Sequence, residues 1–479
     1  MGKSRWFWAI FALFLGVRLW AFAAGDNGID FHHNAFDRPL YVERQVARGD
    51  FRPDPVYPPV HFYLLAALRL ISTDLEYAPR LLSLLCALLS FVPLWRLTRR
   101  WFGDAAAAWA GLAYALFPLG VRVAVVSLEV APYLLFLALA FERLAAAWQT
   151  RATDRRAEWT GVIWLSLAAA TRFEGWIFLP LVALLALWRD RTAGLRTVVL
   201  CAVFPVAWLG YQWLITGRPF YFLAVSGEIS RVHMAAVPLA ERLLAWPRIV
   251  LGATNPLVTL AALGGFVLPA ARRNGGWLIL LFVVSLAVFT ARTALGAAGF
   301  NETKYAAALG LMLLPFAGLG AATVLAKLAA DQRPLGAAAV ALACGAISLF
   351  QIAGDNARFR ADPDLRAVAA WLAENRGDRA VVIGTRDQGF LFLVGRIPPQ
   401  ARLLASTDDQ TGRIDLNELQ KALRAPGEKL LVYDTIPDGM DFFPVLKLPP
   451  GGEADALGGH FTPLRQQGPY TIYAVRELP

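Results

Sequence analysis

The chain has 479 residues, of which 57% are hydrophobic and only 17% charged, and its mean hydropathy is +0.47. Ordinary soluble domains cannot bury that much apolar surface, so the composition predicts a membrane protein. The net charge of +10 is weak evidence for a nucleic-acid ligand, because multi-span membrane proteins collect Lys and Arg on cytoplasmic loops. All three cysteines lie in apolar runs, which argues against disulfide, redox or thiolate zinc chemistry.

In chain order, about eleven apolar stretches are long enough to cross a hydrocarbon core of about 30 Å. Every second connection between them is basic, starting with Lys3 and Arg5, which predicts a cytoplasmic N-terminus. An odd number of spans then places the chain after Gly354 on the outer side. The stretches are 6–24, 79–98, 105–121, 128–148, 158–171, 175–188, 197–215, 248–270, 277–291, 305–326 and 335–353.

The first span also resembles a secretory signal, since Ala21-Phe22-Ala23 has the form of a cleavage site. Its apolar stretch is longer than a usual signal core and is interrupted by Arg18, which favours an uncleaved anchor. Cleavage would leave the rest of the topology unchanged.

Two predicted outer segments are long, a first external loop at 25–78 and a second at 216–247. The first loop concentrates Asp, Glu and His residues as no other part of the membrane half does. Within it, Val60–Ile71 is apolar but too short to span the bilayer. We expect this stretch to form a helix lying in the outer interface.

From Asp355 the chain becomes polar, and Asp362-Pro363 opens an amphipathic helix whose predicted apolar face consists of Leu365, Val368, Ala369 and Leu372. Three short apolar runs predict strands, and a second helix is expected around Leu416–Leu423. The sequence therefore predicts an α-helical polytopic membrane domain at 1–354 and an extracytoplasmic α/β domain at 355–479. The second domain could serve as a lid, bind an acceptor, or dock a partner. The predicted strands are Ala380–Ile383, Lys429–Tyr433 and Thr471–Val475.

The spans hold few ionisable residues at mid-depth, which argues against a proton or ion relay. Chemistry is therefore expected at the outer surface, where the first loop offers carboxylates beside the lipid boundary. A carboxylate there can act as general base towards a hydroxyl or amine acceptor.

The first loop carries a recognisable series of motifs: Asp37-Arg38-Pro39-Leu40-Tyr41, then Ala47–Phe51, then Tyr57–Tyr63 with its Pro-Pro pair. This series resembles the first external loop of polyprenyl-phosphate-sugar-dependent glycosyltransferases of the GT-C superfamily. That group includes protein O-mannosyltransferases and aminoarabinose transferases. The resemblance implies a GT-C-like fold and an acidic residue of this loop as the catalytic base.

The identity of that base stays open between Asp37 and Asp30. The family often has an Asp-Glu pair, whereas Arg38 follows Asp37 here, and Asp30 competes from beside His32 and His33. Those two histidines are weak candidates for a divalent metal site, because adjacent side chains diverge and can hardly both bind one ion. No cofactor is certain, and a divalent metal is possible.

The resemblance continues through the membrane half. Ser127–Pro132, with Glu129, resembles the family's fourth span, where a second acid faces the catalytic cavity. Asn301–Tyr305 resembles the family's basic-Tyr motif, with Lys304 in place of Arg, and a cation there could neutralise the leaving phosphate. The predicted donor- and acceptor-binding residues are Tyr41, Tyr57, His61, Glu129, Arg172, Glu174, Lys304 and Tyr305.

Each of these side chains also has a structural interpretation. Lys304 could extend to the membrane interface, and Glu129 could be an ordinary end-of-helix charge. Arg172 and Glu174 could form a structural ion pair or a solvated hairpin tip. His61 could pack beneath the loop, and His233 could be an exposed loop residue.

The favoured hypothesis is an inverting membrane glycosyltransferase that moves a sugar from a polyprenyl-phosphate carrier to a lipid, glycan or protein acceptor. Its predicted location is a bacterial inner membrane, with the active site on the extracytoplasmic side. The alternatives are a transporter or flippase of lipid-linked sugars and a non-catalytic envelope-assembly protein. The scarcity of mid-membrane charges and the lack of a repeated half argue against a transporter.

Overall fold

The computed structural model divides the chain into two compact units. The helical unit comprises Met1–Asp26, Pro53–Leu64 and Arg80–Arg358, and the loop-sheet unit comprises Asn27–Arg52, Leu65–Pro79 and Phe359–Pro479. The first external loop thus divides between the two units, and its parts 27–52 and 65–79 group with the C-terminal region. The structure describes residues 5–25, 34–149, 154–225, 237–296, 303–358, 363–384, 407–408, 413–414, 424, 427–434, 448–449, 451–456 and 458–477.

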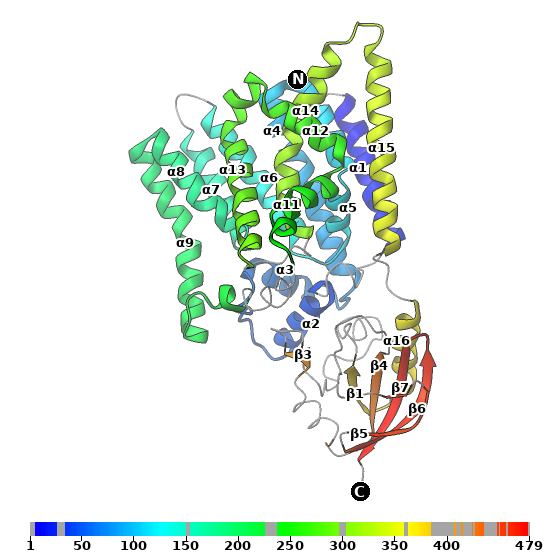
Figure 1. The fold of residues 1–479 in the computed structure, drawn as a ribbon. Helices are drawn as coiled ribbons and strands as arrows, with labels where there is room; N and C mark the ends of the chain where they lie inside the picture. The colour runs from blue at the N-terminus through cyan, green and yellow to red at the C-terminus, as the bar shows by residue number, and fades with distance from the viewer. Residues whose placement is uncertain are drawn as a thin grey trace. The chain divides into compact units, whose positions relative to one another are not determined.

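The helical unit is a bundle of apolar helices (Figure 1). Helix α3, Pro59–Arg69, matches the short apolar helix predicted at Val60–Ile71. The bundle helices are α1 (Arg5–Ala24), α4 (Tyr77–Ala115), α5 (Pro118–Val125), α6 (Val130–Trp148), α7 (Arg155–Ala169), α8 (Gly175–Arg189), α9 (Arg191–Thr216), α11 (Leu239–Thr254), α12 (Pro256–Phe266), α13 (Pro269–Ala294), the short 3-10 turn η1 (Thr303–Tyr305), α14 (Ala306–Ala326) and α15 (Arg333–Arg358).

All of the predicted spans fall on these helices, but single helices do not correspond to single spans. Within the described residues, seven helices are long and apolar enough to cross a membrane, or eight if a bent pair counts as one span. Helix α4 covers the second predicted stretch and most of the third, and it consists of two helices that meet at a kink at Gly103, whose φ of 85° and ψ of −179° are not helical. Helices α7 and α8 have 15 residues each, so they are shorter than a helix that crosses a membrane completely.

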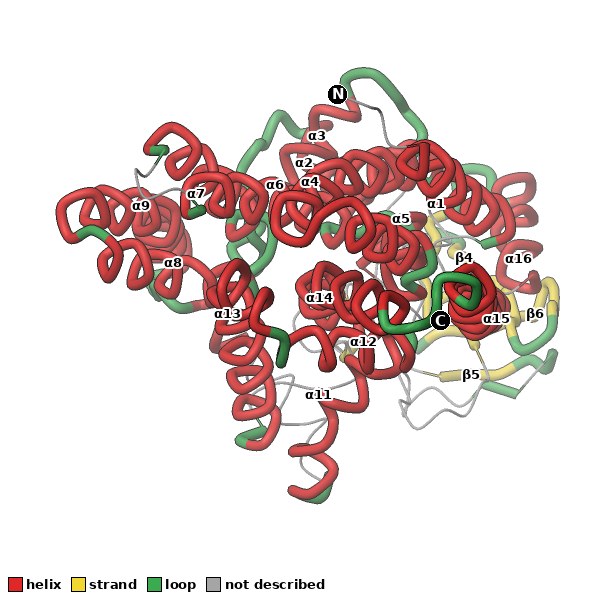
Figure 2. The backbone as a smooth tube through the Cα atoms, turned by 90° about the horizontal axis from the view of Figure 1, so that it is seen from above, coloured by secondary structure: helices red, strands yellow, loops and turns green. Residues whose placement is uncertain are grey.

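Helix α14 lies at the centre of the bundle, and most of its side chains are buried. Figure 2 shows it among the helices it packs against, α6, α11, α12 and α13. A helix that is apolar all round requires such a position, because it has no polar face to offer water. Helix α15 is by contrast largely exposed along its apolar length, as a helix facing lipid would be.

The bent pair breaks at Asn255, where α11 and α12 meet at 110°. Asn255 adopts a left-handed φ of 78°, and its Oδ1 accepts a hydrogen bond from the Leu257 backbone N–H at 2.9 Å. Its Nδ2 donates to the Cys344 carbonyl at 3.0 Å and to Ser348 Oγ at 2.8 Å on α15. A helix break inside a membrane needs such replacement partners, because no water is there to satisfy the freed backbone groups.

In the loop-sheet unit, α16 (Pro363–Asn375) accompanies a five-stranded sheet of order β1-β4-β7-β6-β5. Strand β1 pairs parallel to β4, while β4, β7, β6 and β5 are antiparallel neighbours. The strands are β1 (Ala380–Gly384), β4 (Lys429–Asp434), β5 (Ala454–Ala456), β6 (Gly459–Gln467) and β7 (Tyr470–Glu477), with a separate pair β2 (Thr407–Asp408) and β3 (Arg413–Ile414).

The predicted C-terminal α/β region is therefore confirmed. The three predicted strands are β1, β4 and β7, and the buried face of α16 consists of Leu365, Val368, Ala369 and Leu372 as expected. The sequence did not predict β6, whose apolar pattern is interrupted at Pro463, beside an irregularity in its pairing with β7. It also did not predict α2 (Asn34–Ala47) in the first loop. The helix predicted at Leu416–Leu423 lies outside the described residues.

Candidate functional site

Arg172 lies in a tight turn between α7 and α8. The backbone N–H groups of Thr171 and Arg172 both donate to the Ala168 carbonyl, at 3.0 and 2.9 Å, which closes the end of α7. Helix α8 starts directly afterwards at Gly175, where a Cβ atom would come within 2.7 Å of the Ala169 Cα. Only glycine permits that approach. The short turn leaves the Arg172 side chain 4% exposed inside the helical unit.

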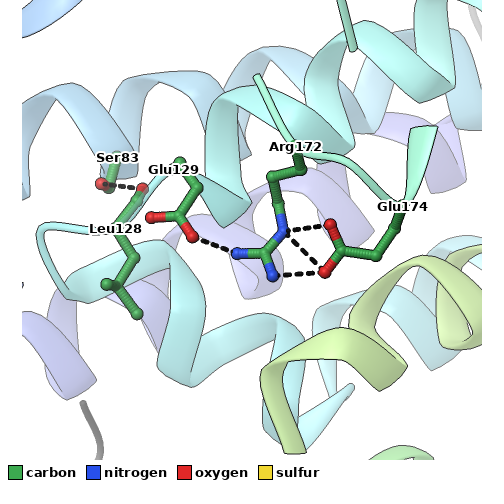
Figure 3. Close-up of polar contacts among 5 residues, drawn as sticks. All are labelled: Ser83, Leu128, Glu129, Arg172 and Glu174. Atoms are coloured by element: carbon green, nitrogen blue, oxygen red, sulfur yellow. Dashed lines mark hydrogen bonds and ion pairs between the residues drawn. The ribbon is translucent and has the colours of Figure 1, made fainter. Parts of the chain in front are cut away.

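Two carboxylates hold the Arg172 guanidinium between them (Figure 3). Its Nη1 donates to Glu129, while its Nε lies 3.2 and 3.1 Å from the two carboxylate oxygens of Glu174 and its Nη2 bonds the same group. Every guanidinium nitrogen therefore has a carboxylate partner. The side chains of Glu129 and Glu174 are 5% and 12% exposed, so this is a buried ion cluster rather than a solvated hairpin tip.

The two acids occupy equivalent places in the fold. Glu129 is the N-cap residue of α6 and Glu174 that of α8, and neither side chain caps its own helix. The partial positive charge of a helix N-terminus stabilises a carboxylate there. Burial by itself lowers the pKa of the Arg172 guanidinium, but Glu174 and Glu129 outweigh it and raise that pKa above its ordinary value. Arg172 therefore stays charged.

Lys304 and Tyr305 join the cluster from η1, directly before α14. The Tyr305 ring lies 4.8 Å from the Arg172 Cζ and 5.5 Å from the Lys304 Nζ. Two cations thus share one aromatic ring, an arrangement that a low-dielectric site strengthens. Lys304 is 4% exposed and does not extend into open solvent.

Tyr133, one turn into α6, completes the set and was not predicted from the sequence. Its side chain is 2% exposed and interacts electrostatically with Glu174 and Arg172. Within the part of the chain that the structure describes, its hydroxyl has no hydrogen-bond partner. The spacing of four residues from Glu129 is the signal that could have found it, since residues i and i+4 share a helix face. We call Glu129, Tyr133, Arg172, Glu174, Lys304 and Tyr305 the Arg172 cluster.

The segment 55–61, which leads into the first turn of α3, is fixed to the same turn. The Val60 N–H donates to the Ala170 carbonyl at 2.9 Å, and Gln212 of α9 donates to the Pro55 carbonyl at 2.8 Å. This segment carries two predicted binding residues, Tyr57, which is half-buried, and His61, which is 3% exposed. The buried ring of His61 agrees with packing beneath the loop.

The predicted acids of the first loop belong to the loop-sheet unit. The backbone of Asp37 lies in the first turn of α2, while its side chain, like the whole of Asp30, His32, His33 and His233, lies outside the described residues. The nearby Tyr41 hydroxyl accepts a hydrogen bond from Gln45 Nε2 at 2.9 Å. No group of three metal-binding side chains occurs among the residues that the structure describes.

Arg18 and Arg80 are also buried, but backbone carbonyls hold them. Arg18 of α1 donates to Tyr114 and Ala115, where the chain breaks before Pro118. Arg80 donates to the carbonyls of Phe22 and Gly25, at 2.8 and 2.9 Å, and to that of Val125 at 2.8 Å. These carbonyls lie in the last turns of α1, α4 and α5 or directly after them, where a helix leaves acceptors over, so we infer a structural role for both arginines.

Comparisons with known proteins agree with this architecture. Residues 56–213, from before α3 to near the end of α9, match the family described as dolichyl-phosphate-mannose-protein mannosyltransferase. The structure of ArnT from Cupriavidus metallidurans bound to undecaprenyl phosphate is similar over 99% of this chain and 98% of that one, with a TM-score of 0.67 and 16% identity. The chain therefore has the same fold as that structure.

Other solved structures share this fold more loosely. The oligosaccharyltransferase AglB from Archaeoglobus fulgidus, in complex with an inhibitory peptide and a dolichol-phosphate, has a TM-score of 0.55 and 13% identity, with 90% of this chain and 70% of that chain covered. The mycobacterial arabinofuranosyltransferase AftD has a TM-score of 0.50 and 16% identity, over 98% of this chain and 41% of that one. No curated protein sequence matches the chain.

Proposed function

We propose that this protein is a membrane glycosyltransferase that takes a sugar from a polyprenyl-phosphate carrier. The observation that carries the proposal is the Arg172 cluster, a buried set of paired cations and carboxylates at helix ends within a GT-C fold. Two solved structures with this fold, ArnT and AglB, contain undecaprenyl phosphate and dolichol-phosphate respectively. A lipid-linked phosphate and its sugar are the ligand class that such a set of charges suits.

Within the cluster, the charges divide into two roles. Arg172 uses every guanidinium nitrogen on Glu129 and Glu174, so it serves to orient these two acids. Lys304, beside Tyr305, supplies the cation that neutralises the phosphate as the sugar leaves. A fixed cation in a site with little water stabilises such developing charge without reorganisation.

The base comes from the first loop. Asp37, with Asp30 as the alternative, removes the proton of an acceptor hydroxyl or amine. The acceptor oxygen or nitrogen then forms a bond to the anomeric carbon, and the bond from that carbon to the phosphate oxygen breaks. The carrier leaves as polyprenyl phosphate, and a single displacement inverts the anomeric configuration.

We propose that this reaction takes place at the extracytoplasmic face of a bacterial inner membrane, with a lipid, glycan or protein as acceptor. The alternation of basic loops supports that side of the membrane. A divalent cation, where one takes part, would be held by Asp30 or Asp37 with one of His32 and His33. Removing divalent ions with a chelator and restoring Mg²⁺ or Mn²⁺ tests that arrangement directly.

The test is transfer from a polyprenyl-phosphate sugar by the purified full-length protein, followed as release of the carrier phosphate. The Asp37→Asn variant should lose at least about a hundredfold in rate, with Asp30→Asn as its comparison and the exposed Asp50→Asn as control. A flippase would move the lipid without breaking the sugar–phosphate bond, and an assembly protein would do neither. Full activity of the Asp37 variant would remove Asp37 from the mechanism.

A further inference from the structure

The loop-sheet unit joins two regions that lie far apart in the sequence. It combines the first-loop parts 27–52 and 65–79 with the C-terminal region from 359 onwards. Helix α2, which carries Asp37 in its first turn, therefore belongs to the same compact unit as the sheet. The described side chains reveal how the two regions are connected.

One connection joins α2 to the end of α3. The Arg69 Nη2 donates to Glu43 Oε1 at 2.8 Å, and its Nε bonds the other oxygen of the same carboxylate. The side chains of Arg69 and Glu43 are only 18% and 12% exposed. Arg69 Nη1 also donates to the Ser72 carbonyl at 2.6 Å. A two-pronged bond of this kind fixes direction as well as distance, so it sets the orientation of α2 relative to 69–72.

A second connection joins residues 72–79 to α16. Asp74 Oδ1 accepts hydrogen bonds from the Glu76 and Tyr77 N–H groups, at 2.8 and 2.6 Å, and so fixes the backbone at Glu76. The Glu76 carboxylate, 11% exposed, pairs with Arg366 Nη2 of α16 at 3.2 Å. A continuous series of polar contacts thus runs from α16 to the helix that carries Asp37.

Helix α16 is itself firmly attached to the sheet. Its apolar face, with Leu365 and Leu372, is fully buried, and it packs against β6 and β7. Asp364 at its first turn accepts a hydrogen bond from Gln467 Nε2 of β6 at 2.6 Å. Because α16 is fixed to the sheet, its contact with Glu76 connects residues 72–79 to the α/β domain as a whole.

We propose that Glu76 and Arg366 are positioning residues, through which the C-terminal α/β domain holds the first-loop helix that carries the catalytic base. The domain then contributes to catalysis without touching the substrate. This inference rests on the proposed function for its kinetic readout, but not for its structural one. Misplacement of a base by about 1 Å can cost a hundredfold in rate.

The experiment compares Arg366→Gln and Glu76→Gln with the charge-swapped double variant Glu76→Arg/Arg366→Glu in the full-length protein. The control is Arg476→Gln, which removes the exposed ion pair to Glu428 at 3.2 Å, within the sheet and away from the first loop. We expect kcat to fall about tenfold in each single variant while the KM for the donor stays within about twofold. The swapped pair should recover most of the loss, and the control should keep the wild-type kcat.

Hydrogen exchange of the 34–47 amides gives a readout that does not depend on activity. It should be faster in Arg366→Gln than in wild type and unchanged in Arg476→Gln. Wild-type exchange in α2 together with wild-type kcat in Arg366→Gln would overturn the inference, as would equal losses in the control. Absence of transfer by the wild-type protein would instead refute the proposed function. The rate of amide exchange in α2 would still show whether Arg366 connects the α/β domain to that helix.

Discussion

Three buried arginines of the helical unit have different kinds of partner. Arg172 lies between two carboxylates, whereas Arg18 and Arg80 donate to backbone carbonyls. A carbonyl dipole satisfies a guanidinium hydrogen bond but does not cancel its charge. A carboxylate does both, and here two carboxylates meet one guanidinium.

We propose that this difference separates structural from functional charge. A cation held by carbonyls repairs a helix end, as Arg80 does for the last residues of α1. The cluster of Glu129, Arg172 and Glu174 instead pairs one cation with two anions, and Lys304 lies beside it. A buried balance of charges of this kind can respond to a charged ligand, which is why we propose the donor site there.

The largest effect should follow loss of the cation that both carboxylates share. Arg172→Gln removes the guanidinium that two carboxylates share, which we expect to cost about 3–5 kcal/mol in the free energy of unfolding. Reversible unfolding in mixed micelles measures this cost. Adding Glu129→Gln to the same chain should restore part of the stability, because it removes one of the two negative charges that Arg172 neutralises. An unchanged free energy of unfolding in Arg172→Gln would show that the ion cluster does not stabilise the fold.

A smaller loss of stability should follow the equivalent change at a carbonyl-held arginine. Arg80→Gln removes charged hydrogen bonds to Phe22, Gly25 and Val125, and we expect a cost of about 1–3 kcal/mol. The KM for the donor should be unchanged in the protein that remains folded. A large rise in that KM would show that the contrast between the two kinds of arginine is wrong.

Tyr133→Phe should reduce transfer without reducing stability. Its buried hydroxyl has no hydrogen-bond partner among the described residues, so removing it leaves no new unsatisfied group. We expect about a tenfold lower kcat, because the hydroxyl can donate to a ligand bound in the cluster. The matched control is Tyr114→Phe, whose hydroxyl bonds Ser90 at 2.5 Å and should cost about 1 kcal/mol with no change in rate. The opposite pattern would exclude a ligand contact for Tyr133.

The smallest effect concerns an exposed ion pair. Arg52 donates to Asp50 at 2.9 and 2.8 Å, and the bonds lower the Asp50 pKa from 3.8 to about 2. Because the pKa is lower in the folded state, the stabilisation is complete above about pH 4 and is lost as the pH falls towards 2. In Asp50→Asn the free energy of unfolding should therefore depend slightly less steeply on pH between these two values. An equally steep profile in the variant would show that the pair contributes nothing.

The sequence predicted the features that depend on local composition. The length of each apolar stretch located the helices, since a bilayer crossing needs a fixed number of apolar residues in a row. The short apolar runs at 380–383, 429–433 and 471–475 predicted strands, because each is bounded by polar segments and is too short to cross a bilayer. Glu129, Lys304 and Tyr305 were predicted from the family resemblance, and Arg172 and Glu174 from their place in a predicted outer turn. The structure brings these five together.

Other features could not be predicted from the local sequence pattern. Strand β6 and helix α2 are too mixed in composition to stand out, and tertiary pairing forms them. The break at Asn255 depends on direct hydrogen bonds to Cys344 and Ser348, which lie 89 and 93 residues further along the chain. Tyr133 became a candidate site residue only because the structure places it beside the other members of the Arg172 cluster.

The amino-acid sequence by itself determined that this is a polytopic membrane protein with a C-terminal α/β region, because hydrophobic burial follows from run length and period. Only the tertiary structure decided that Arg172 pairs with an acid 43 residues away, and that the first loop groups with the C-terminal sheet. Ion pairing between distant residues leaves no periodic signal in the sequence, since it depends on which distant segments the fold brings together.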